Sequence, residues 1–136
     1  MILYVDTSAL VKLYVPEPES SAVQTLIESA QVSAISLIAF AEARAAFARK
    51  RRERAIGPKD YGRVVQEFDD DWEHYFIVDV TESLVKRAAQ LAERHGLRGY
   101  DAIQLSSAIL LRQQSGEAVS FAISMIDYCE RAGAKV

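Results

Sequence analysis

The sequence predicts an α/β protein, a three-layer α/β/α sandwich whose central, mostly parallel sheet has about four to five strands. Short apolar, β-prone runs alternate with longer segments of helical periodicity, and no linker, repeat or low-complexity tract interrupts them. Parallel strands need crossover connections, and the helices in those connections cover both faces of the sheet. With 136 residues, 50% hydrophobic and 26% charged, we expect a single domain over 1–136.

The individual elements follow from local composition. Strands are predicted where short runs are rich in apolar, β-branched or aromatic residues: 2–5, 32–35, 76–80 and 119–123. Helices are predicted from 7 to about 16, from 18 or 19 to 28, from 37 to 54, from 59 to about 73, from 82 to 95, from 101 onward, and briefly after the fourth strand. In the third helix we expect Ser36 as the N-cap, with an apolar stripe of Ile38, Ala41, Ala45 and Ala48.

The charge balance limits the possible partners. The formal net charge is −3. Proteins that bind nucleic acid through their overall electrostatic field are usually basic, so any nucleic acid must be held by a local basic patch or by metal ions. No apolar run could span a bilayer, and the first residues lack the features of a signal peptide. The lone Cys129 cannot form an internal disulfide, so we expect a cytoplasmic protein without membrane association.

Acidic side chains fall at the carboxyl ends of the predicted strands, where parallel α/β sheets bind ligands. Asp6 follows the first strand, Glu42 lies in the helix after the second, Asp101 opens the helix before the fourth, and Ser124 and Asp127 follow the fourth. Taken alone, each acid is explained as a helix N-cap, a charge that suits a helix dipole, or a surface residue. Converging carboxylates repel one another unless a cation lies between them, and oxygen ligands select hard ions. Together the acids therefore predict a site for Mg²⁺ or Mn²⁺.

Other polar groups are expected to be structural. Asp69, Asp70 and Asp71 cannot share one ion, because successive helical side chains point about 100° apart, so we expect a solvated face. His95 is expected at a helix end, and His74 is expected to pack among its aromatic neighbours. Neither histidine has a Ser or Cys partner at a spacing that suggests a catalytic triad.

Three segments together resemble one known family. The match consists of ILYVDTSALVKLYVPEPES (2–20), SAISLIAFAEARAAFAR (33–49) and LRGYDAIQLSSAILL (97–111). In order and spacing these resemble the motifs of PIN-domain nucleases, in particular the VapC-like toxins of type II toxin–antitoxin systems. The resemblance covers essentially the whole chain. It implies a PIN-like fold, catalytic and metal-binding roles for Asp6, Glu42 and Asp101, an endoribonuclease activity on RNA, a small antitoxin partner and a homodimer.

The fourth motif departs from the family pattern of a hydroxyl residue, one spacer and an Asp. Ser124 matches the hydroxyl, Ile126 stands where the Asp is expected, and Asp127 comes one residue late. A slip of one residue turns a helical side chain by about 100°. Either a local shift brings Asp127 into the metal shell, or the fourth acid is lost. In the second case the alternative is a catalytically weak or inactive module that binds RNA or an antitoxin without cleaving.

Candidate substrate-binding residues surround these acids. The hydroxyls of Thr7, Ser8 and Ser124 are expected either to orient water or phosphate, or to cap helices. Arg98 is expected to contact a phosphate near the site. The basic run 49–54 either suits the dipole of its helix or contacts an RNA backbone or an acidic part of an antitoxin. Tyr100 either stacks on a base or packs in the core.

Overall fold

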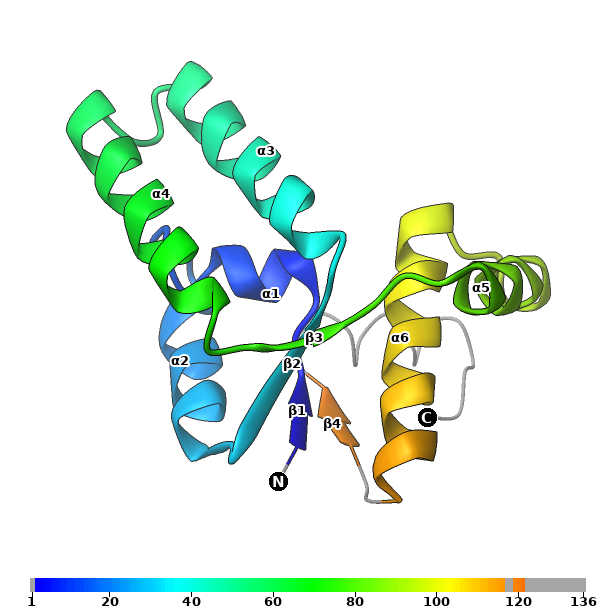
Figure 1. Cartoon of the computed structure of the whole chain (residues 1–136). Coiled ribbons are helices and arrows are strands. Elements are labelled where there is room, and N and C mark those ends of the chain that lie inside the picture. Colours follow the sequence, from blue (N-terminus) through cyan, green and yellow to red (C-terminus); the bar gives the residue numbers. More distant parts are fainter. Residues whose placement is uncertain (1, 117–118, 122–136) are drawn as a thin grey trace.

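The computed structural model describes residues 2–116 and 119–121, and its centre is a four-stranded sheet. The strands are β1 (Ile2–Tyr4), β2 (Val32–Ser36), β3 (Phe76–Val78) and β4 (Val119–Phe121). They lie in the order β3-β2-β1-β4, and every neighbouring pair is parallel (Figure 1). The register places Leu3 opposite Ser33 on one side and Ser120 on the other. All four predicted strands are present, with β3 two residues shorter than expected.

Helices cover both faces of this sheet. They are α1 (Thr7–Val11), α2 (Ser20–Ser29), α3 (Ala39–Arg52), α4 (Pro58–Trp72), α5 (Glu82–His95) and α6 (Gly99–Ser115). Figure 1 shows α1 to α4 on one side of the sheet and α5 and α6 on the other. The side chains of β1 alternate accordingly, because Leu3 is buried in a cluster with α1 to α4 and Tyr4 is buried in a cluster with α5 and α6. The predicted α/β/α sandwich is therefore confirmed.

An aromatic cluster fixes α3 and α4 against the first part of the chain. Phe68 of α4 is fully buried, and its ring meets those of Tyr14 and Phe47 edge-on at centroid distances of 5.5 Å each. Trp72 packs on Phe68 at 5.8 Å. Edge-to-face rings add specific geometry to the burial of a large apolar area. The cluster therefore holds α3 in one position above α1.

Two details predicted for the third helix were wrong. Ser36 is the buried last residue of β2, and α3 begins only after Ile38. The buried face of α3 consists of Ala39, Ala43 and Phe47, whereas Ala41 and Ala45 are exposed and Ile38 and Ala48 are partly buried. A phenylalanine buries far more apolar area than an alanine, so Phe47 determines which face turns to the core.

The expectations for the histidines had different outcomes. His74 is exposed rather than packed, because Trp72 and Tyr75 supply the apolar contacts of that turn. His95 ends α5 as predicted, and the left-handed Gly96 follows it at φ 65°.

The three consecutive aspartates of α4 do not gather around one point. Asp70 and Asp71 are exposed, and Asp69 lies partly buried beside Arg44 at 2.9 Å. Asp71 accepts a hydrogen bond from the Tyr14 hydroxyl at 2.9 Å. Across the part of the chain that the structure describes, no helix has the length and apolar character needed to cross a membrane.

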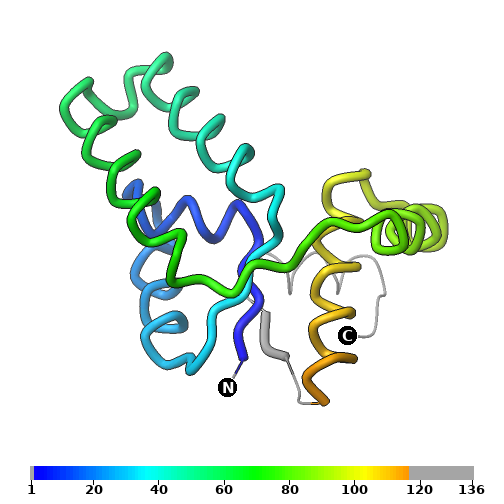
Figure 2. Tube along the Cα trace, viewed as in Figure 1, coloured from blue at the N-terminus to red at the C-terminus, as the bar shows by residue number. Residues whose placement is uncertain are grey.

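The carboxyl ends of β1 and β2 lead to the region of interest. Figure 2 shows the chain leaving both strands at the same edge of the sheet and entering α1 and α3. The Val5 amide donates to the Ala34 carbonyl at 2.9 Å, which continues the pairing up to that edge. Side chains at the starts of α1 and α3 are therefore brought close together.

Candidate active site

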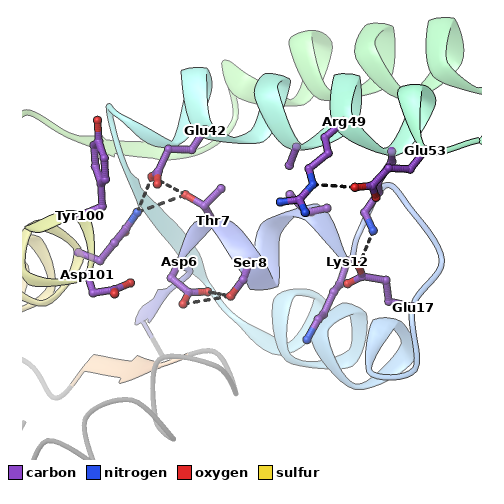
Figure 3. A pocket seen from close by; sticks show the side chains of 14 residues that line it. Asp6, Thr7, Ser8, Lys12, Glu17, Glu42, Arg49, Glu53, Tyr100 and Asp101 are labelled. Carbon is purple, nitrogen blue, oxygen red and sulfur yellow. Dashed lines mark hydrogen bonds and ion pairs between the residues drawn. The ribbon is translucent and has the colours of Figure 1, made fainter. Parts of the chain in front are cut away.

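A pocket of about 470 Å³ opens at this edge, between α1, α3 and α6. The polar residues around one end are Asp6, Thr7, Ser8, Glu42, Tyr100, Asp101 and Gln104. Charged residues line the other end: Lys12, Glu17, Arg49, Lys50 and Glu53. Figure 3 shows the carboxylates of Asp6, Glu42 and Asp101 facing one hollow from separate elements. The structure thus brings together the three acids that the sequence singled out.

Asp6 has two roles, as the N-cap of α1 and as a residue that lines the pocket. It lies between β1 and α1 with an extended backbone and acts as the N-cap of α1. Its Oδ1 accepts from the Ala9 amide at 2.9 Å and from the Ser8 hydroxyl at 3.2 Å. Asp6 can therefore cap α1 and line the pocket at the same time, because α1 extends away from the Asp6 carboxylate.

Glu42 lies in the first turn of α3, and two donors hold its Oε1. The Thr7 hydroxyl donates at 2.8 Å and the Gln104 amide donates at 3.1 Å. Burial raises the pKa of Glu42 above its ordinary value, against the lowering effect of these two hydrogen bonds. The negative charges of Asp101 and Asp6 raise this pKa further. Their influence indicates that the three carboxylates act on one another across the pocket.

Asp101 lies in the first turn of α6, with its side chain 30% exposed. The Arg98 guanidinium donates to its Oδ2 at 3.1 Å, although Arg98 itself is 87% exposed. Tyr100 is 65% exposed and lines the pocket beside Asp101. Of the two readings of Tyr100, core packing is thus excluded, and a ring available for stacking remains.

Two further polar residues of the site were missed by the sequence analysis. Gln104 is buried, and its Nε2 donates to both Glu42 and Thr7, the latter at 3.2 Å. Its Oε1 accepts from the hydroxyl of the fully buried Tyr4. Gln104 follows Asp101 by nearly one helical turn, a spacing that places both on one face and was a usable signal. Tyr4 was hidden among the apolar residues of β1, and no local pattern marks it.

Thr7 and Ser8 donate to acids of the pocket, and neither is the N-cap of a helix. Thr7 donates to Glu42 and Ser8 donates to Asp6. The N-cap of α1 is Asp6 itself. Ser124, Ile126 and Asp127 lie outside the described residues.

The basic run at the end of α3 divides into two parts. Arg49 and Lys50 line the pocket. Arg51 lies over the ring of Tyr61 at 5.2 Å, while Arg52 is exposed away from the pocket lining. The structure thus distinguishes the basic residues that line the pocket from those that do not, which the sequence alone could not do.

The carboxylate oxygens of the pocket are suitable ligands for a hard divalent cation. Carboxylate oxygens are the ligands that Mg²⁺ and Mn²⁺ prefer, and a cation would relieve the repulsion that raises the pKa of Glu42. Within residues 2–116 and 119–121, however, no three acidic, His or Cys side chains are placed around a single point. Each of the three acids is instead turned onto a donor of the protein. Binding a cation at all three acids therefore requires a rearrangement of their side chains.

The fold and the pocket define the class of the protein as an α/β domain with an acidic pocket at the carboxyl edge of a parallel sheet. Residues 3–121 match the PIN domain. Two ribonucleases of Mycobacterium tuberculosis, VapC45 and VapC49, are each 32% identical to the chain over 108 residues, or 79% of this chain and 75% of theirs. The chain therefore belongs to the PIN domain family, as the sequence motifs indicated.

Solved structures agree on the fold. FitAcB from Neisseria gonorrhoeae superposes with a TM-score of 0.66 at 18% identity, covering 100% of this chain and 96% of that one. VapC20 of Mycobacterium tuberculosis, described as a toxin that cleaves the sarcin–ricin loop, gives 0.64 at 17% identity over 92% and 93%. A toxin–antitoxin complex from Klebsiella pneumoniae gives 0.60 at 23% identity over 81% and 80%. At these identities the likeness establishes the PIN architecture.

Proposed function

We propose that the protein is a divalent-metal-dependent endoribonuclease, the toxin of a toxin–antitoxin pair, and that the acidic pocket is its active site. One observation carries the proposal, since acids from three separate sequence motifs line one pocket. The two Mycobacterium tuberculosis relatives are ribonucleases, and the chain matches 75% of their length. We assign the cytoplasm as the place of action.

Asp6, Glu42 and Asp101 are the proposed ligands of Mg²⁺ or Mn²⁺. Such a cation, when bound, neutralises charge on a phosphodiester oxygen and lowers the pKa of a water. The protein's own contribution is to hold Glu42 and Asp6 near the positions from which they would bind the cation. Thr7 and Ser8 do this by donating to Glu42 and Asp6. We further propose that Asp127 completes the metal shell and that the Ser124 hydroxyl contacts the substrate; both residues follow β4 in the sequence.

Substrate contacts are assigned on both sides of the acids. The Arg98 side chain is 87% exposed and forms an ion pair with Asp101. We propose that its guanidinium gives up part of this ion pair to bind a phosphate of the RNA. Tyr100 offers an exposed ring to an unstacked base. An RNA strand recognised in this way must be single-stranded at the site, because bases in a duplex do not present their faces.

The other end of the pocket is the proposed path of the RNA backbone. Lys12, Arg49 and Lys50 reach it from α1 and α3. Each is paired with a glutamate, as in the Lys50–Glu17 contact of 2.8 Å. Partly exposed ion pairs contribute about 0–1 kcal/mol each, so a phosphate can replace the glutamate at little cost.

The proposed partners are a small antitoxin and a second copy of this chain. The Klebsiella pneumoniae structure of the same fold is a toxin–antitoxin complex. An antitoxin that covers the acidic pocket would block RNA access. The test of this part is co-expression with the small reading frame next to the gene, followed by co-purification and a measurement of mass in solution.

The activity itself is tested with purified, antitoxin-free protein and a fluorogenic single-stranded RNA in Mn²⁺, Mg²⁺ or EDTA. We expect cleavage that needs a divalent cation and is lost in Asp6→Asn and in Asp101→Asn. Asp70→Asn is the matched control, because Asp70 is an exposed acid on α4 that does not line the pocket. Binding of RNA without cleavage under any condition would reject the enzyme and favour the non-cleaving module.

A further inference from the structure

We propose that Gln104, held in one orientation by Tyr4, is a positioning residue that prepares Glu42 for cation binding. This inference rests on the proposed metal site and adds two residues that are neither acids nor contacts of the RNA. The two side chains come from opposite parts of the chain, β1 and α6, and meet under the pocket.

The side chains of Glu42, Thr7 and Gln104 form a closed triangle of hydrogen bonds. Gln104 Nε2 donates to Glu42 Oε1 at 3.1 Å and to Thr7 Oγ1 at 3.2 Å. Thr7 Oγ1 then donates to the same Glu42 oxygen at 2.8 Å. Both bonds to the carboxylate end on Oε1, so Glu42 can turn Oε2 toward a cation without losing either donor. Figure 3 shows the Thr7–Glu42 side of this triangle.

The direction of every hydrogen bond in this network is determined. An ionised carboxylate only accepts, so the Gln104 amide must present its NH₂ group to Glu42. Its Oε1 then faces Tyr4, whose hydroxyl must donate. If the amide were flipped, its carbonyl oxygen would face the carboxylate. Glu42 therefore fixes the orientation of the Gln104 amide, and Tyr4 stabilises that orientation by donating to Gln104 Oε1.

A second buried polar residue of α6 shows how the arrangement around Gln104 differs from the ordinary hydrogen bonding of a buried polar side chain. Ser106 is also fully buried, and it donates to the Leu84 carbonyl at 2.9 Å, away from the pocket. That bond joins α6 to α5 and involves no acid. Gln104 instead directs all its described hydrogen bonds to Tyr4, Thr7 and Glu42. Ser106 is thus a control for loss of a buried hydrogen bond on the same helix.

The test measures Mn²⁺ binding directly. The purified full chain is titrated with Mn²⁺, and the free Mn²⁺ is followed by its electron paramagnetic resonance signal. Gln104→Met keeps the side-chain volume and removes both donors, so we expect Kd to rise about tenfold or more, the usual effect of losing a residue that orients a metal ligand. Tyr4→Phe should give a smaller rise, because Gln104 still donates to Glu42 and Thr7 and loses only the hydrogen bond to its Oε1. The double variant should bind no more weakly than Gln104→Met alone, since Tyr4 acts only through Gln104.

Ser106→Ala should lower the thermal midpoint while leaving the Mn²⁺ affinity unchanged. The inference is overturned if Gln104→Met binds Mn²⁺ like the wild type, if Ser106→Ala weakens binding equally, or if the effects of Gln104→Met and Tyr4→Phe simply add. Tyr4→Phe keeps the proposal testable should Gln104→Met fail to fold. A wild type that neither binds Mn²⁺ nor cleaves RNA would instead reject the proposed function, which distinguishes the two failures.

Discussion

Glu42 is subject to opposing demands that affect stability as well as chemistry. Its folded-state pKa is raised, first by burial and then by the charges of Asp101 and Asp6. A group with a raised pKa contributes stability that is complete below its unfolded-state pKa and is lost as pH rises through the folded-state value. Without a metal ion, the charged form of Glu42 therefore weakens the fold above its ordinary pKa of 4.5.

We expect Glu42→Gln to raise the thermal midpoint of the metal-free protein in mildly alkaline buffer by about 1–3 °C. The change is small because solvent screening limits such half-buried charge effects to under about 1 kcal/mol. The amide oxygen can still accept from Thr7 and Gln104. Circular dichroism in EDTA measures the effect, and the gap between variant and wild type should close as pH falls toward 4.5. A variant less stable than wild type at alkaline pH would contradict this account.

The two roles of Asp6 can be separated by two substitutions. Asn keeps an oxygen that accepts from the Ala9 amide, whereas Ala removes the N-cap of α1. We expect Asp6→Asn to lose cleavage with little change in stability. Asp6→Ala should lose cleavage and about 1 kcal/mol of unfolding free energy, the usual cost of a missing cap. Urea unfolding measures the difference, and equal stability of the two variants would argue against the cap.

What could be predicted at this scale depends on how local the signal is. Asp6, Glu42 and Asp101 each stand at a recognisable place after a strand or at a helix start, and all three line the pocket. Tyr4 and Gln104 are 100 residues apart in sequence, and their contact exists only because α6 packs on β1. No periodicity in either segment encodes that pairing.

At the scale of elements, the C-terminus of α3 contains local strain. Arg54 follows the C-cap at φ 60°, a left-handed conformation that costs a non-glycine residue about 1 kcal/mol. The Ala55 amide donates back to the Lys50 carbonyl at 2.8 Å, as in a Schellman motif. The turn directs the chain from α3 into α4.

We expect Arg54→Gly to stabilise the protein by about 0.5–1 kcal/mol, since glycine adopts this conformation without steric cost. Arg52→Gly is the control, because it places glycine at the last helical residue of α3, where glycine relieves no strain and should not stabilise the protein. Chemical denaturation of both variants provides the measurement. A destabilised Arg54→Gly would show that the arginine side chain contributes more than its backbone strain costs.

Elements were easier to predict than their faces. The four strands and the order of helices followed from apolar runs and caps. One such cap is Thr81, whose side-chain oxygen accepts a hydrogen bond from the Leu84 amide at the start of α5. The face of α3 did not follow, because alternating alanines give nearly equal stripes and only Phe47, packed on Phe68, decides between them. That decision requires knowing which helix lies opposite.

On the scale of the whole molecule, charge distribution matters more than net charge. The chain carries −3 overall, so its average field repels RNA. The acidic end of the pocket adds to this repulsion unless a cation is present. Attraction must therefore come from a few basic side chains, which are Lys12, Arg49 and Lys50 in the pocket and Arg98 beside Asp101. The remaining arginines of the run at the end of α3 lie outside the pocket.

This distribution predicts how RNA binding responds to salt. Each phosphate neutralised on a single strand contributes about 0.7 to the slope of log affinity against log salt concentration. In an Asp6→Asn background, which prevents cleavage, we expect Lys50→Gln and Arg49→Gln each to reduce the slope by about that amount. Arg52→Gln should change it far less, although it removes the same charge from the same helix. Fluorescence anisotropy of a labelled single-stranded RNA at several salt concentrations measures the slopes. Equal slopes for all three variants would mean that RNA affinity depends on the total charge of α3. The RNA backbone would then not bind along the pocket.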